Sequence, residues 1–315
     1  MGRHIIRQLA TTIPVLVLVS VIVFLFAHLA PGDPITALAG DQVVDEQVVA
    51  RLREDYGLDR PLPVQYLTWA GNAMTGDLGY SFNTRQDVSD ILLDRLAVTV
   101  LLTVFALVIA LSVAIVMGVL AAIYKGSWID YANQLLAMIG GSMPAFWFGI
   151  LLILLVSQRL KWLPASGYVS FTDNPIDALR HLILPAITLS TGYAAVLCRV
   201  TRASMLDVLH EDYVRTARAK GLSPRRVNMG HAFRSALLPI ITMVGVEAGH
   251  LLGGAVITET VFALPGMGRL LVDSVSSRDF PVFQGATLVL VILLVASNTV
   301  ADIAYGLADP RVRRR

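Results

Sequence analysis

Long stretches without any charged side chain are the feature of this sequence that most restricts its fold. Asp, Glu, Lys and Arg are all missing between Arg7 and Asp33. They are missing again at 96–124, 131–158, 181–198 and 280–301. Each stretch reaches the roughly 18 apolar residues that can cross the hydrocarbon core of a bilayer. Only 15% of the residues are charged, whereas soluble domains carry roughly 25%. The sequence therefore predicts an all-α integral membrane protein.

A further apolar stretch, at about 236–262, contains two acids, Glu247 and Glu259. Acids inside a membrane are tolerated where they face a bundle interior or a cavity, so this stretch is also predicted to span. The first stretch is longer than the apolar region of a secretion signal and is read as a retained helix. Six transmembrane helices are thus predicted, at about 9–30, 97–123, 132–158, 181–205, 236–262 and 281–304.

The distribution of basic residues predicts the orientation of these helices. An even number of spans places both termini on one side of the membrane. The short segments on that side hold fifteen Lys and Arg residues, against five in the short segments on the other side. Because basic residues concentrate in cytoplasmic loops, both termini and the loop at 206–235 are expected in the cytoplasm.

The chain then divides into four parts. These are an N-terminal tail with the first helix (1–30), an external segment (31–96), a five-helix core (97–305) and a basic tail (306–315). Apolar residues recur at helical spacing in the external segment, which predicts short amphipathic helices. The expected helices cover 44–56, 62–74 and 88–96. The segment is read as an external helical subdomain between spans 1 and 2, and the alternative is a simple connection.

The cytoplasmic loop carries clear signals for two helices and a turn. Asp212 can begin a helix, and Gly221 is placed to end it. Ser223 and Pro224 then suit the first positions of a second helix. Small side chains at Ala217 and Ala219 would let another protein approach closely. The alternative is an interfacial helix whose basic residues meet anionic lipid headgroups.

Polar and small residues in the fifth span suggest two further roles. Gly245, Gly249 and Gly253 recur every four residues, a spacing that lets helices pack closely. Glu247 and His250 can share a different face of the same helix. They are candidates for lining a translocation path, and the alternative is a satisfied pair within the bundle.

No pattern for catalysis or metal binding is found. The sequence lacks GxxxxGK[ST], HExxH, GxSxG and any Cys/His cluster, so no catalytic, cofactor-binding or metal site is predicted. The single cysteine, Cys198, excludes a disulfide within the chain.

Several motifs resemble the permease subunits of ABC importers for dipeptides, oligopeptides and nickel. DYVRTARAKGL at Asp212–Leu222 is similar to the coupling loop of this branch, although Arg215 and Thr216 stand where the wider family has Glu and Ala. The other matching motifs are GLDRPLPVQY (Gly57–Tyr66), GDLGYSF (Gly76–Phe82), PAFWFGILLI (Pro144–Ile153), LPASGY (Leu163–Tyr168), HLILPAITL (His181–Leu189) and LLGGAVITETVFALPGMGRLL (Leu251–Leu271).

The resemblance implies the type I ABC importer permease fold and a bacterial inner-membrane location. It also implies partners: a second, homologous permease, two cytoplasmic P-loop ATPases that bind ATP and Mg, and an external solute-binding lipoprotein. The coupling residues it assigns are Asp212, Tyr213, Arg215, Ala217, Arg218, Lys220, Gly221, Leu222 and Arg225. The expected cargo is a dipeptide or oligopeptide, with nickel or a glutathione-like compound as alternatives. A proton-coupled secondary transporter using Glu247 and His250, or an ABC exporter, is a rival reading.

Overall fold

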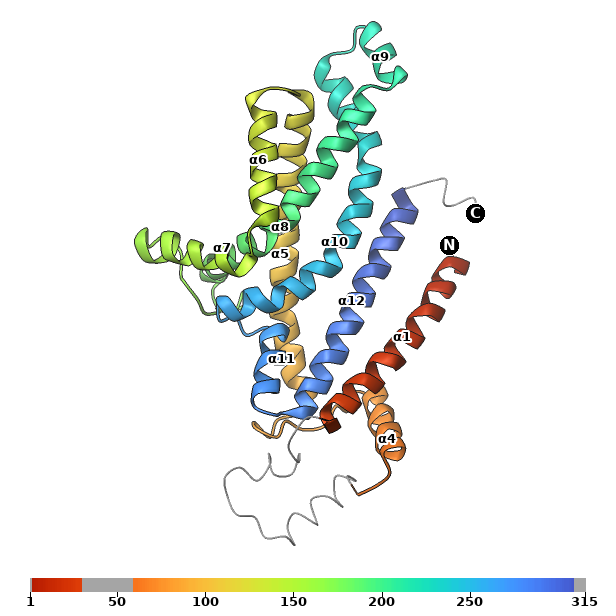
Figure 1. The fold of residues 1–315 in the computed structure, drawn as a ribbon, viewed down its shortest axis with the longest axis vertical. Coiled ribbons are helices and arrows are strands. Elements are labelled where there is room, and N and C mark those ends of the chain that lie inside the picture. Colours follow the sequence, from red (N-terminus) through yellow and green to blue (C-terminus); the bar gives the residue numbers. More distant parts are fainter. Residues whose placement is uncertain (1, 30–58, 309–315) are drawn as a thin grey trace. The chain divides into compact units, whose positions relative to one another are not determined.

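A computed structural model of the chain describes residues 2–29 and 59–308, and these ranges are almost entirely helical (Figure 1). Their one β-type contact is an isolated bridge between Tyr80 and Asp87. The predicted all-α class is therefore confirmed for these ranges. The helices are α1 (Gly2–Leu29), α4 (Leu62–Thr75), α5 (Val88–Ile123), α6 (Trp128–Ser142), α7 (Ala145–Leu152), α8 (Pro175–Leu209), α9 (Asp212–Ala219), α10 (Phe233–Val261), α11 (Met267–Ser276) and α12 (Phe280–Ala308). Two π-helical segments adjoin them, η1 (Ile153–Arg159) after α7 and η2 (Arg226–Ala232) before α10.

Within the described ranges, four helices are long and apolar enough to cross a membrane. They are α5, α8, η2 together with α10, and α12. The pair formed by α6 and α7–η1 passes the same test, but its two parts are bent by 106°. In α1, the part whose side chains the structure describes, Ile13–Phe26, is also apolar. The described parts of the predicted apolar segments are thus mainly helical, while the count of six spans stays a prediction.

Parts of the external segment can be compared with the prediction. The helix expected at 62–74 is confirmed by α4. The separate helix expected at 88–96 is wrong, because α5 begins at Val88 and continues to Ile123. No Gly or Pro occurs between 88 and 98 to interrupt the helix. The helix expected at 44–56 and the basic residues at 311–315 lie outside the described residues.

The chain folds as two compact units. The first contains Thr99–Leu264 and the chain from Leu294 onward, and α8 lies at its centre against α6, α7 and α10. The most apolar window of α8 is 61% buried, whereas the corresponding windows of α5 and α12 are each 22% buried. The helix with the lowest mean hydropathy of the four is thus the one most enclosed by protein.

Small side chains allow close helix packing in the first unit. Ala110 and Ala114 of α5 form a buried cluster with Ala194, Leu197 and Cys198 of α8. One turn after Ala114, a Cβ on Gly118 would lie 2.7 Å from the Cβ of Thr201, closer than real Cβ atoms approach. Such contacts between small residues are the usual way for membrane helices to pack tightly.

The second unit contains the described residues within Gly2–Val98 together with Pro265–Leu293. Its apolar core joins Val88 and Leu92 of α5 to Met267 of α11 and to Val282 and Ala286 of α12. A buried carboxylate ties a loop to this core. The side chain of Asp279 accepts hydrogen bonds from the Ser81 hydroxyl at 2.5 Å and from the Phe82 backbone N–H at 3.1 Å.

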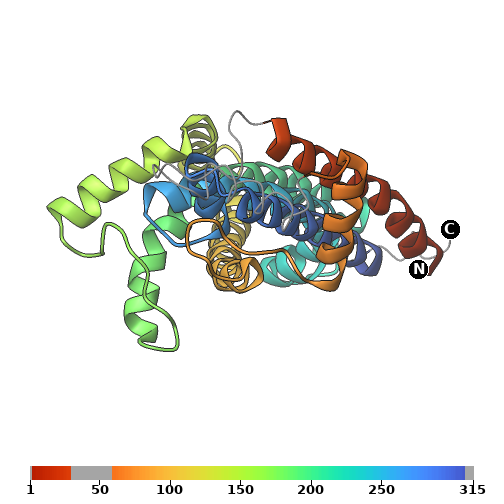
Figure 2. The ribbon, with the colours of Figure 1, turned by 90° about the horizontal axis from the view of Figure 1, so that it is seen from below.

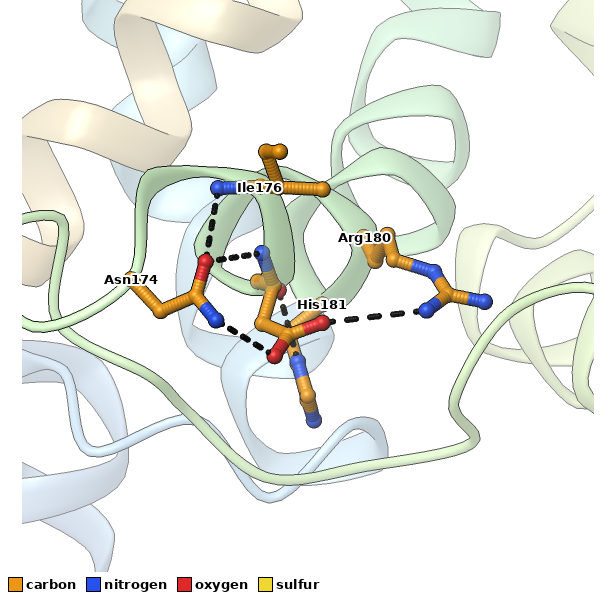
Figure 3. Close-up of polar contacts among 5 residues, drawn as sticks. Asn174, Ile176, Arg180 and His181 are labelled. Atoms are coloured by element: carbon orange, nitrogen blue, oxygen red, sulfur yellow. Dashed lines mark hydrogen bonds and ion pairs between the residues drawn. The ribbon is translucent and has the colours of Figure 1, made fainter.

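A side-chain cap fixes the start of α8 (Figure 3). The Asn174 side-chain oxygen accepts hydrogen bonds from the backbone N–H groups of Ile176 and Asp177, which have no partner inside the helix. The Asp177 side chain then meets the Asn174 amide at 2.8 Å and Arg180 at 3.7 Å. The Nδ1 atom of His181 lies 2.8 Å from the Asp177 carbonyl oxygen. This network sets where α8 enters the bundle.

Candidate functional site

The helix α9 lies at the end of the first unit where α8 ends and η2 leads into α10 (Figure 1). It begins at Asp212, as the sequence predicts. Asp212 lies in its first turn and Arg218 in its last. An acid at the start and a base at the end both complement the helix dipole. This short, exposed helix is therefore favoured by its own sequence.

A buried residue anchors α9 to the bundle. The Val214 side chain is fully buried, although its neighbours along the helix are exposed. The helix lies against η2, whose Val227 is also fully buried. The Tyr213 hydroxyl donates a hydrogen bond of 3.0 Å to the Ser235 hydroxyl in α10. One side of α9 thus contacts η2 and α10, and the opposite side is exposed.

The turn after α9 has the geometry that the sequence predicts. Gly221 has φ +79°, in the left-handed region where side chains other than Gly are strained. The Leu222 N–H donates to the Ala217 carbonyl at 3.3 Å, and the Gly221 N–H donates to the Arg218 carbonyl at 3.0 Å. These two bonds define a Schellman motif. The next helix restarts at Pro224, also as predicted.

The nine predicted coupling residues all lie on this short segment. Ala217 and Leu222 are half-buried, and the remaining seven residues are exposed. The exposed ones are Asp212, Tyr213, Arg215, Arg218, Lys220, Gly221 and Arg225. Four of these seven are basic, so α9 and its turn present a positively charged surface.

A pocket of about 210 Å³ lies inside the first unit, among α6, α7, α8 and α10. It adjoins the break between α6 and α7, which occurs at Met143 and Pro144. Figure 2 shows α7 leaving sideways from the bundle at this point. The lining residues are Gly140, Met143, Ala145, Phe148, Thr188, Leu189, Thr191, Gly192, Tyr193, Val196, Glu247 and Gly254.

The structure brings Glu247 and His250 together, but in different surroundings. Glu247 lines the pocket and is 7% exposed. The His250 side chain is 69% exposed, and its Nδ1 atom lies 3.8 Å from the Glu247 carboxylate. The backbone carbonyl of His250 accepts a hydrogen bond of 2.8 Å from the Tyr193 hydroxyl. Tyr193 is a pocket residue that the sequence alone did not single out.

Two glycines of the row in α10 pack closely against α12. A Cβ on Gly245 would clash with Ala301 of α12, and one on Gly249 would lie 3.0 Å from Asn298 and from Leu294. Within the described residues, a Cβ on Gly253 would meet no atom within 4 Å. Its neighbour Gly254 instead approaches the Tyr193 hydroxyl, which a Cβ would meet at 2.9 Å.

Two buried polar contacts were missed at the level of sequence. Arg202 binds Asp130 through two hydrogen bonds, of 2.6 and 2.8 Å, and so joins α8 to α6. The Thr99 hydroxyl donates a hydrogen bond of 2.6 Å to Glu259, one of the two acids in the fifth predicted span. An arginine close to an apolar run was the available signal for the first contact.

Comparisons with known proteins address the function of this arrangement. A family model described as "Binding-protein-dependent transport system inner membrane component" matches residues 114–314. The model of the N-terminal region of the same components matches residues 1–103. The chain belongs to this family. It is therefore a multi-pass inner-membrane component of a transport system, and the family as a whole works with ATPase and binding-protein partners.

Full-length relatives of this permease have been named. A putative peptide transport system permease protein of Brucella abortus is 46% identical over 99% of each chain. The dipeptide transport system permease protein of Escherichia coli K12 is 42% identical over the whole of each chain. Among solved structures, an inward-facing methionine ABC transporter covers 69% of this chain, with a TM-score of 0.51 and 19% identity. That structure supports the permease fold.

Proposed function

We propose that the chain is the membrane-spanning permease of an ATP-driven importer for short peptides. The observation that carries this proposal is the full-length similarity to named peptide permeases. The di/tripeptide transport system permease of Pseudomonas aeruginosa is 43% identical over the whole of each chain. Under this proposal the chain binds no cofactor. A second permease would complete the pathway, and two cytoplasmic ATPases would bind ATP and Mg.

The segment Asp212–Leu222 is proposed to dock on one ATPase. The buried Val214 anchors α9 to the bundle. A force that the ATPase applies to the exposed face of α9 would therefore displace α8 and α10 as well as the loop. Its exposed face is basic and would suit an acidic groove. ATP-driven closure of the ATPases would then tilt the spans, and an external binding lipoprotein would deliver the peptide.

Substitution of Ala217 tests the docking role. Ala217→Asp adds a charge and bulk to a half-buried position on α9, so it is expected to reduce ATP-driven dipeptide uptake at least about tenfold. Ala217→Ser keeps the side chain small and should retain most uptake. Uptake of a radiolabelled dipeptide is measured in cells that lack the native gene, with membrane levels of each variant matched.

Two results would contradict the proposed coupling to ATPases. Full uptake by Ala217→Asp would remove the coupling role from this segment. Uptake that persists without the ATPases and stops when the proton gradient collapses would indicate a secondary transporter. The cargo is tested with nickel and glutathione as competitors of dipeptide uptake. If either compound inhibits uptake at a lower concentration than a second dipeptide does, the substrate class is not peptides but that of the stronger competitor.

A further inference from the structure

The pocket beside the break between α6 and α7 presents only hydrogen-bond acceptors among its polar side chains. Three hydroxyls line it, and each donates its single hydrogen to a backbone carbonyl. Thr188 donates to Leu184 at 2.9 Å, Thr191 to Ile187 at 2.7 Å and Tyr193 to His250 at 2.8 Å. The oxygen lone pairs are what remains for a ligand.

A carboxylate completes the polar lining. Glu247 lies midway along α10, where α10 faces the pocket, and its side chain is 10% exposed. Among the described residues, the ion-pairing distance to Glu247 is met by the His250 ring, whose Nδ1 atom lies 3.8 Å away, beyond hydrogen-bonding distance. No Lys or Arg lines the pocket. A negative charge enclosed in this way is stabilised by a positively charged partner.

The end of α6 has a backbone carbonyl that lacks its usual helical donor. Gly140 lines the pocket, and its carbonyl would normally accept a hydrogen bond from the N–H four residues later. That residue is Pro144, which has no N–H. The last turn of α6 is also the negative end of its helix dipole. Both features favour a cation over an anion.

The size of the pocket limits what it can hold. At roughly 30 Å³ per water, a volume of 210 Å³ corresponds to about seven water molecules. This is smaller than the roughly 300–1,000 Å³ of pockets that enclose a whole small-molecule ligand. The site therefore fits one end of a peptide rather than the entire molecule. Met143, Phe148 and Leu189 provide an apolar wall for the adjoining side chain.

We infer that this pocket binds the ammonium end of the transported peptide, with the Glu247 carboxylate as its counter-ion. An ammonium group has three donors and no acceptor, which matches a lining composed of acceptors. The inference rests on the proposed function of peptide import. Binding at a site along a transport path must be weak enough for the peptide to be released. The small pocket and the exposed His250 ring beside Glu247 are both consistent with weak binding and a short residence time.

The test uses the complete permease–ATPase assembly in lipid nanodiscs without the binding protein. The probes are alanyl-alanine, its C-terminal amide and its N-acetyl derivative, and the dissociation constants are measured by saturation-transfer NMR titration. The first two probes keep the ammonium group and should bind about tenfold more tightly than the third. Glu247→Gln should abolish this difference, whereas Glu247→Asp should retain part of it.

A matched control removes one negative charge elsewhere. Asp173→Asn changes an exposed acid in the loop before α8 and should leave all three constants unchanged. Size-exclusion profiles and basal ATPase activity show whether each assembly is intact. Thr191→Val, which removes one acceptor, provides a second test if Glu247→Gln does not assemble, and it should weaken binding of both ammonium probes only.

The outcomes separate the inference from the proposed function. Equal binding of the three probes to the wild-type assembly, or an unchanged preference in Glu247→Gln, would overturn the ammonium site. ATP-driven uptake of alanyl-alanine by the wild-type assembly with its binding protein is measured in parallel. If that uptake occurs while the ammonium preference is missing, only the pocket assignment fails. If there is no uptake of any peptide, the proposed function itself fails.

Discussion

Arg202 and Asp130 form a bidentate ion pair whose carboxylate is buried. The guanidinium uses Nε and Nη2 on the two carboxylate oxygens, and the Asp130 side chain is only 3% exposed. The same carboxylate also accepts from the Gly126 backbone N–H at 3.0 Å and from Gln134 at 3.0 Å. Because its oxygens are saturated by donors, the buried charge is compensated, and α6 is held to α8 near the end that carries α9.

The first prediction concerns this pair. Arg202→Lys cannot form the bidentate hydrogen bonds to Asp130, and Asp130→Asn leaves the arginine without its counter-ion. Breaking a fully buried pair costs about 3–5 kcal/mol, and the 23% exposure of the Arg202 side chain reduces this to about 1–3 kcal/mol. Both variants should lower the unfolding temperature of the purified protein in detergent.

A matched control exists in the exposed pair of Arg180 and Asp177. Its side chains are 55% and 45% exposed and lie 3.7 Å apart. Exposed pairs contribute about 0–1 kcal/mol, so Arg180→Lys should leave the unfolding temperature nearly unchanged. Equal effects of Arg202→Lys and Arg180→Lys would contradict the structural role assigned to the buried pair.

At the scale of elements, the two prolines within apolar runs behave differently. A proline in the interior of a helix removes one backbone hydrogen bond and can kink or break the helix. Pro185 lies inside the continuous helix α8, whereas Pro144 separates α6 from α7. Two glycines, Gly140 and Gly141, stand just before Pro144 and lower the helix propensity there. Apolar composition predicted the segment at 132–158 but carried no information about the direction in which its second half runs.

The second prediction tests the break itself. Pro144→Ala supplies an N–H that can donate to the Gly140 carbonyl, so α6 should extend and the pocket lining should change. Dipeptide uptake is expected to fall severalfold, with no loss of thermal stability. Pro185→Ala, within a helix that already continues through its proline, should have a smaller effect on uptake. Wild-type uptake by Pro144→Ala would show that transport does not need the break.

The third prediction concerns the turn after α9. Gly221 has open space around it, so backbone conformation alone decides which side chains fit. Asn tolerates the left-handed region better than other residues, and β-branched Val tolerates it poorly. Gly221→Asn should therefore keep dipeptide uptake and peptide-stimulated ATPase activity, and Gly221→Val should reduce both. Equal activities in the two variants would indicate that the orientation of α9 does not depend on this turn.

At the scale of the whole molecule, sequence and structure contribute different information. Charge-free runs predicted which segments are helical, because crossing hydrocarbon requires a long apolar helix. Glycine and proline signals predicted the turn at Gly221. The pocket was not predictable, because it joins Gly140, Tyr193 and Glu247 from three helices far apart in the sequence. These residues lie close together because their helices pack around α8, and hydrophobic periodicity does not predict which helices pack together.

The last prediction concerns the orientation across the membrane that the count of basic residues predicts. Cys198 is the single cysteine and is buried, so Cys198→Ala gives a chain without thiols. Thr172→Cys then places one exposed thiol in the loop before α8, and Ser223→Cys places one just after α9. A membrane-impermeant maleimide should label Thr172→Cys in intact cells and label Ser223→Cys only in inverted vesicles. The opposite pattern would place α9 outside the cell, where no ATPase could reach it, and would overturn the coupling role together with the topology.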